Sequence, residues 1–230
     1  MLKVRSLFGV AAALVLTPLM AVPAWSSPCV SDTVAAYEAL GAGGCSVGPV
    51  TFSKINVTTP IITGGGTITF GNFTPFVDST GTEFGLTLHF LSSVPTGARV
   101  DFSWDYNVTG DPILIDALLA ISGSPGTGGG IIVSETLTGT APNPPLEIRT
   151  PPGPNSVTSL LNPAVVSTSV FKDDFIIGGT AEGILGLTAQ SELTNAFSVP
   201  GPIVGAGVPG LVFACGGLVG LARRRRRQIV

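Results

Sequence analysis

The sequence predicts a mainly β protein: an antiparallel β-sandwich of about nine or ten strands, with one short N-terminal helix and a C-terminal transmembrane helix. Three observations support this fold class. Apolar and polar residues alternate with a period of two through most of the middle of the chain. Glycine and proline clusters at 64–66, 123–130 and 142–154 separate the alternating runs. Long uncharged apolar segments lie near both ends.

The N-terminal segment, residues 1–26, is typical of a secretory signal peptide. Lys3 and Arg5 precede a long apolar run, and small residues follow it. These small residues permit cleavage after Ala24 or after Ser26. We therefore expect this segment to be removed and the rest of the chain to be exported.

Two of the three cysteines, Cys29 and Cys45, belong to the expected exported part, whereas Cys215 lies in the apolar C-terminal segment. In an oxidising compartment a Cys29–Cys45 disulfide is the expected state, and two free thiols are the alternative. Closing a loop of this size stabilises a protein by roughly 3 kcal/mol, mainly through the unfolded state.

The residues between these cysteines predict one short helix. Ser31 or Asp32 is suited to cap its start, and Val34, Tyr37 and Leu40 fall on one helical face. The glycines at 41, 43 and 44 end it.

The strands follow from residue 49 onward, where the apolar period changes to two. The clearest alternation runs over residues 100–107, and a bulge is expected near Lys54 in the first strand. Asp111-Pro112 predicts a turn, and the proline-rich stretch 141–154 predicts a long loop, apart from a short strand within it. The predicted strands lie at 50–57, 68–73, 84–90, 100–107, 113–121, 131–137, 147–150, 165–177 and 184–197.

The C-terminal apolar segment, residues 203–222, carries no charge. At 1.5 Å per residue a helix of about twenty residues spans roughly 30 Å, the thickness of the hydrocarbon core of a bilayer. A cluster of basic residues after such a span stays on the cytoplasmic side, so residues 27–198 are expected across the membrane as one domain. The basic cluster consists of Arg223, Arg224, Arg225, Arg226 and Arg227.

The end of the chain resembles a known sorting signal. Val199-Pro200-Gly201-Pro202, the glycine-rich apolar segment and the arginine cluster follow one another over residues 199–230. This order is similar to the PEP-CTERM tail of exported proteins of Gram-negative bacteria, although Gly201 replaces the usual glutamate. The resemblance implies recognition by exosortase, a membrane-embedded cysteine transpeptidase that removes the tail and passes the protein to the cell surface. The alternative is a plain single-span anchor.

A second motif lies near the N-terminus, where Tyr37-x-Ala39-Leu40 is followed by glycines and Cys45. It resembles a motif that opens a β-rich domain in a group of PEP-CTERM proteins. The family's association with exopolysaccharide and biofilm matrices implies a structural surface or matrix role. The alternative is a carbohydrate-binding module that holds polysaccharide through Trp104, Tyr106 or Tyr37.

Charge and residue types exclude several other functions. Four basic residues stand against fourteen acidic ones in residues 27–198, a net charge of −10. This acidic balance makes nucleic acid an unsuitable partner. His89 is the single histidine, which excludes a His-Glu-x-x-His zinc centre and means that a Ser-His-Asp arrangement would have to use His89.

The carboxylates do not predict a catalytic pair either. Asp101 and Asp105 fall on one face of a strand at a separation of roughly 13 Å. Carboxylate pairs of glycoside hydrolases lie about 5–9.5 Å apart. Asp173 and Asp174 would point to opposite faces of an extended strand, and no calcium-loop spacing accompanies them. We therefore expect no enzymatic activity, no cofactor and no metal site.

Overall fold

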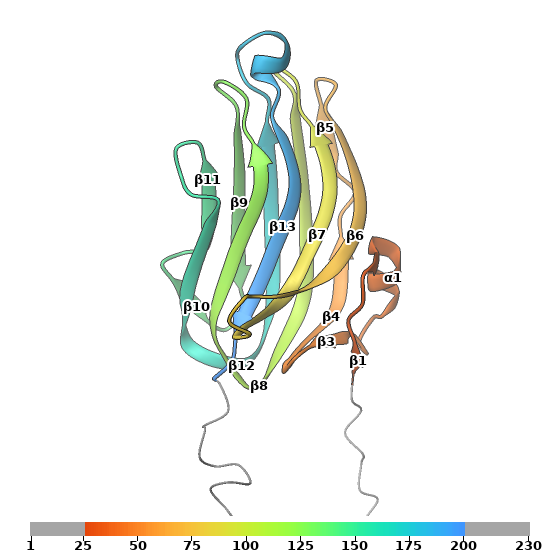
Figure 1. The fold of residues 1–230 in the computed structure, drawn as a ribbon, viewed down its shortest axis with the longest axis vertical. Coiled ribbons are helices and arrows are strands. Elements are labelled where there is room, and N and C mark those ends of the chain that lie inside the picture. Colours follow the sequence, from red (N-terminus) through yellow and green to blue (C-terminus); the bar gives the residue numbers. More distant parts are fainter. Residues whose placement is uncertain (1–25, 201–230) are drawn as a thin grey trace, which may run out of the picture.

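A computed structural model describes residues 26–200 (Figure 1). Within this range the chain forms thirteen strands, one α-helix and one short 3₁₀ helix. The elements are β1 (Ser27–Pro28), β2 (Asp32–Thr33), α1 (Val34–Ala39), β3 (Cys45–Val47), β4 (Val50–Val57), β5 (Ile61–Thr63), β6 (Thr67–Val77), β7 (Glu83–Ser93), β8 (Arg99–Ser124), β9 (Gly130–Leu137), β10 (Ala141–Asn143), β11 (Glu147–Thr150), β12 (Ser156–Ile177), η1 (Gly183–Gly186) and β13 (Ala189–Ser198).

All thirteen strands of residues 26–200 belong to one continuous hydrogen-bonded sheet, so the predicted antiparallel sandwich is wrong. The main strand order is β1-β3-β4-β8-β13-β7-β6-β2, and β12 joins β8 to β9 and β10. The strands run along the long axis of the molecule, and the sheet curls back on itself at the bottom of Figure 1, where β8 and β12 lie. One strand pair, β1 with β3, is parallel, and the others are antiparallel.

The curl is possible because two long strands bend without breaking. Residues 99–109 of β8 pair with the second half of β12, and residues 114–120 pair with its first half. Register shifts in β12 separate these two stretches. The Asp111-Pro112 turn expected from the sequence therefore lies at a bend inside β8. Shortly after it the buried positions change from even numbers, up to Leu114, to odd numbers, from Ala117.

The bends divide the curled sheet into two limbs. We call one the β13 limb; it contains β2, β6, β7, β13 and β10 with the second half of β8 and the first half of β12. The other is the β9 limb; it contains β1, β3, β4, β5, β9 and β11 with the remaining halves of β8 and β12.

Aromatic side chains fill the space between the limbs. Phe73 of β6 lies 5.0 Å from Trp104 of β8, measured between ring centroids. Phe70 and Phe90 of the β13 limb each lie 5.2 Å from Phe102 of the β9 limb. These contacts close one hydrophobic core inside the curl, as the alternation over residues 100–107 requires.

Several elements match their predictions. The bulge near Lys54 is present, because Lys54 has φ +52° and the β4–β8 register shifts between Ser53 and Asn56. The predicted helix is α1, but its cap is Thr33, whose Oγ1 accepts a hydrogen bond of 3.2 Å from the Ala36 N–H, and not Ser31 or Asp32.

Other predictions differ from the structure. The stretch expected as strand 184–197 begins as η1, because glycines surround Ile184 and Leu185 and leave both side chains exposed. The expected loop 141–154 contains a second strand, β10, besides the predicted one at 147–150. The first half of β12, over residues 156–164, was also not predicted.

The predicted transmembrane helix at 203–222 lies outside the described residues. Within residues 26–200, no helix has the length and apolar character needed to cross a bilayer. The single α-helix of this range, α1, has six residues. The α-helical part of the described fold is therefore confined to one short helix at the edge of the sheet.

The aromatic contact between the limbs gives a stability prediction. Phe73 is fully buried, whereas Phe171 is 48% exposed on β12. Replacing Phe73 by alanine should lower the free energy of unfolding by about 3–5 kcal/mol, because it leaves a cavity against Trp104. Urea unfolding of the purified protein measures this loss. Phe171→Ala is the matched control and should lower the free energy of unfolding much less. Equal losses in the two variants would show that the interlimb contact adds no stability.

Candidate functional site

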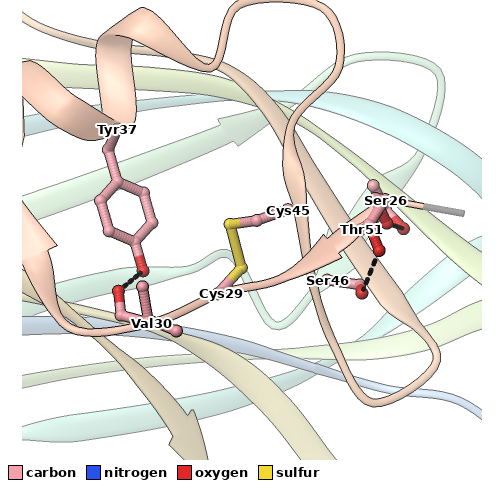
Figure 2. The surroundings of a disulfide bond; sticks show 7 residues. All are labelled: Ser26, Cys29, Val30, Tyr37, Cys45, Ser46 and Thr51. Carbon is pink, nitrogen blue, oxygen red and sulfur yellow. Dashed lines mark hydrogen bonds between the residues drawn. A yellow bond between two sulfur atoms is a disulfide. The ribbon is translucent and has the colours of Figure 1, made fainter.

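The structure places Cys29 and Cys45 in a disulfide bond at the edge of the β9 limb (Figure 2). Cys29 follows β1, and Cys45 begins β3. The two segments also form a parallel pair in which Ser27 lies opposite Cys45. The Cys29 N–H donates a 2.9 Å hydrogen bond to the Ser46 carbonyl. The disulfide therefore fixes the start of the described chain to the sheet.

Helix α1 lies inside the disulfide loop and is held by Tyr37. The Tyr37 hydroxyl donates a hydrogen bond of 2.7 Å to the Val30 carbonyl (Figure 2). Its ring lies 4.9 Å from the Phe73 ring, so it covers the edge of the core. Burial, and secondarily the charge of Asp32, raise the pKa of Tyr37 to about 12. The phenol thus stays a neutral hydrogen-bond donor at physiological pH.

The residues predicted as a sorting motif, Val199 to Pro202, lie at the boundary of the described residues. Val199 is almost completely buried and Pro200 is exposed. Both line a cavity of about 330 Å³ between the end of β13 and neighbouring loops. Gly201, Pro202 and the five arginines 223–227 lie outside the described residues, as does the predicted signal segment up to residue 25.

His89 lies on the outer part of β7, as expected for a strand residue facing solvent. Its Nε2 shares a hydrogen bond of 2.8 Å with Thr74 Oγ1, and its Nδ1 lies 3.4 Å from Glu192 Oε1. The His89 side chain is 35% exposed. These neighbours make a partly exposed polar cluster across three strands.

The carboxylates singled out in the sequence do not gather in one cluster. Asp105 Oδ1 accepts a 2.7 Å hydrogen bond from Asn56 Nδ2, while Asp101 lies beside Asp173. Partial burial, and then the charge of Asp173, raise the pKa of Asp101. Asp173 and Asp174 point to opposite faces, exposed and buried respectively. No group of three or more potential metal ligands occurs among residues 26–200.

The three aromatic residues considered for carbohydrate binding are not surface platforms. Trp104, Tyr106 and Tyr37 are each at most 2% exposed. The Trp104 and Tyr106 rings lie 5.0 Å apart inside the curl. Their role is therefore to pack the core.

Sequence reasoning missed a cluster of buried polar side chains between the limbs, which we call the polar core. Three of its members form one row across adjacent strands, since Lys172 of β12 pairs with Trp104 of β8 on one side and with Glu135 of β9 on the other. The Lys172 amine contacts a Glu135 carboxylate oxygen and lies 5.5 Å from the centre of the Trp104 ring. The Lys172 and Glu135 side chains are both fully buried.

The opposite limb contributes Asn195 of β13 to the polar core. The Tyr106 hydroxyl donates a hydrogen bond to Asn195 Oδ1. Asn195 Nδ2 donates one of 2.7 Å to the Leu118 carbonyl and approaches Glu135 Oε1 at 3.4 Å. Amine, carboxylate, amide and phenol thus meet in a space without exposed surface.

Burial favours the uncharged forms of these groups. It raises the pKa of Glu135, an effect that Lys172 opposes, and it lowers the pKa of Lys172, an effect that Glu135 opposes. It also raises the pKa of Tyr106. A buried ion pair contributes little net stability because desolvation offsets the attraction.

A second buried carboxyl, Asp174, extends the polar core along β12. Gln190 Nε2 donates a 2.7 Å hydrogen bond to Asp174 Oδ2. Asp174 Oδ1 and Gln190 Oε1 have no hydrogen-bond partner within residues 26–200. Burial raises the pKa of Asp174 to about 8, so the protonated form dominates at neutral pH.

Comparisons with known proteins give no relative of this chain: no protein-family model matches it, and no significant match occurs among curated proteins or solved structures.

The disulfide gives the first prediction for this region. The double substitution Cys29→Ser/Cys45→Ser should lower the free energy of unfolding by about 3 kcal/mol, because the loop is no longer closed in the unfolded chain. Urea unfolding of the purified, disulfide-bonded protein measures the difference. Wild type treated with a reductant is the control and should lose the same amount, whereas the reductant should not affect the double variant. An unchanged wild type under reducing conditions would contradict the role of the bond.

Asp174 gives a prediction of pH dependence. Its pKa is raised in the folded state from 3.8 to about 8, so the folded protein binds the proton more tightly than the unfolded chain. The stabilisation by this group is complete below pH 4 and is lost as the pH rises to 8, by at most about 1.4 kcal/mol per pH unit. Asp174→Asn should remove this slope. Urea unfolding between pH 4 and 9 measures it, with Asp105→Asn as the surface control, and parallel profiles for wild type and Asp174→Asn would refute it.

Proposed function

We propose that this chain is an exported structural protein of the Gram-negative cell surface or its exopolysaccharide matrix, delivered by removal of a C-terminal sorting tail. The observation that carries the proposal is the combination of the disulfide at the edge of the sheet with the signal-like and tail-like ends of the sequence. Disulfides persist in the periplasm and outside the cell, and they are rare in the reducing cytosol.

The position of the two ends of the described range supports this role. β1 and the end of β13 lie at the same end of the curled sheet, at the bottom of Figure 1. The loops around η1 and β5 lie at the other end. A protein held by residues after Pro200 would therefore direct the η1 end away from the membrane.

The acidic surface agrees with an external location. The domain from 27 to 198 carries a net charge of −10, which favours solubility and repels nucleic acid. We propose exosortase as the processing partner, the membrane as a transient one, and exopolysaccharide as the surrounding material, with no catalytic role for the domain. The carbohydrate-binding alternative loses its three proposed contact residues, since Trp104, Tyr106 and Tyr37 are buried.

The test is the intact mass of the mature protein from its native host. We expect the mass of a polypeptide that begins after Ala24 or Ser26 and ends near Val199 to Pro202, because both terminal segments are removed. Replacing Pro200 and Pro202 by alanine should leave the tail attached, while the exposed-site control Arg149→Gln should be processed normally. A mature protein that retains residues 223–227 would be a plain anchored protein and would contradict the proposed processing.

A further inference from the structure

The polar core brings together an amine, an amide and a carboxyl group in one buried space. Lys172 Nζ contacts one oxygen of the Glu135 carboxyl group, and Asn195 Nδ2 lies 3.4 Å from the other. Since both oxygens belong to the same group, the lysine amine and the asparagine amide are neighbours. They come from opposite limbs, Lys172 from the β9 limb and Asn195 from the β13 limb.

The Asn195 amide is fixed in one orientation. Its Nδ2 donates to the Leu118 carbonyl, and its Oδ1 accepts from the Tyr106 hydroxyl. A hydrogen-bond donor at Oδ1 stabilises negative charge that develops on this oxygen when a nucleophile attacks the adjacent carbon. The amide nitrogen faces Glu135, which is able to supply a proton to it.

The surroundings also activate the amine. An amine attacks a carbonyl carbon only in its unprotonated form, and burial lowers the pKa of Lys172. Burial raises the pKa of Glu135, so this carboxyl group is suited to exchange protons with the amine and the amide. Trp104 and Tyr106 cover the site and exclude water, which would compete as a nucleophile.

We infer that Lys172 and Asn195 form an intramolecular amide cross-link between β12 and β13, with Glu135 as the proton-transfer group. Lys172 Nζ attacks Cγ of Asn195, and the carbonyl electron pair moves to Oδ1. The Tyr106 hydroxyl stabilises the resulting negative charge by its hydrogen bond. Glu135 accepts a proton from Nζ and delivers one to Nδ2. The Cγ–Nδ2 bond then breaks and ammonia leaves. The product is an amide in which Nζ of Lys172 is bonded to Cγ of Asn195. The reaction needs no oxidant, metal or cofactor, and no electrons are gained or lost.

The cross-link would explain why the fold tolerates the unfavourable free energy of burying the polar core. An uncondensed lysine and glutamate buried in full require desolvation of two charges, and apolar residues of the same size would stabilise such a core equally well or better. In the condensed product Lys172 and Asn195 share a neutral amide, and Glu135 remains as a buried carboxyl group whose pKa burial raises. The reaction occurs once per chain and acts on the protein itself, so this inference does not depend on the proposed cell-surface role.

The test is mass spectrometry of the full-length chain after export from a Gram-negative host, with the disulfide reduced and alkylated. We expect each polypeptide to weigh about 17 Da less than its sequence mass after signal removal, because one ammonia is lost. Trypsin should fail to cut after Lys172 in the denatured protein. Digestion after Glu182 and Glu192 should then leave the segments that contain Lys172 and Asn195 joined.

Three variants locate the reaction. Glu135→Gln, Lys172→Met and Asn195→Ala should each have the full sequence mass, and the first of these should regain tryptic cleavage after Lys172. Asn107→Ala is the matched control, because Asn107 is an asparagine on the outer face of β8 beside Tyr106, and it should keep the mass deficit.

Each alternative result is distinguishable. A wild-type mass without deficit, together with normal cleavage after Lys172, would overturn the cross-link even if the variants failed to fold. A deficit of about 18 Da mapped to Lys172 and Glu135 would show loss of water between these two residues instead, and would overturn the role of Asn195. A 17 Da deficit mapped away from Lys172 would overturn the inference as well.

Discussion

The contact between the two limbs of the sheet is the constraint on which the rest of the structure depends. A single sheet with one apolar face must cover that face, and this chain does so by curling until Phe73 meets Trp104 and Phe70 meets Phe102. The disulfide loop then covers one edge of the core through Tyr37. The same curl brings Asn195 to Glu135, so the polar core exists only because the limbs face each other.

The sequence predicts the local elements well and their assembly less well. The alternation at 100–107, the bulge at Lys54 and the helix at Tyr37 all depend on neighbouring residues, and the structure contains each of them. Whether strands form two sheets or one depends on how β8 continues past Gly110. Asp111-Pro112 marks a change of direction in either case, so the local sequence does not distinguish a loop between sheets from a bend within one strand.

The polar core could have been found from the same alternation. Lys172 and Asp174 occupy the inward positions of β12 between Val170 and Ile176, and Glu135 occupies one of β9 after Val133. A charged residue at a position whose neighbours are buried indicates a buried charge that needs a partner. The sequence does not show that Asn195 is a partner of Glu135, because Asn195 lies on a strand of the opposite limb.

The continuity of β8 and β12 determines how this fold comes apart. Each strand contributes hydrogen bonds to both limbs, so neither limb can separate while the other keeps its ladder intact. In a fold of two separate sheets, no strand is shared, so the sheets can separate without breaking a strand ladder. In this protein the two limbs share β8 and β12. Unfolding is therefore expected as a single cooperative event, in which slow amide exchange extends along the paired stretches of both strands in the two limbs.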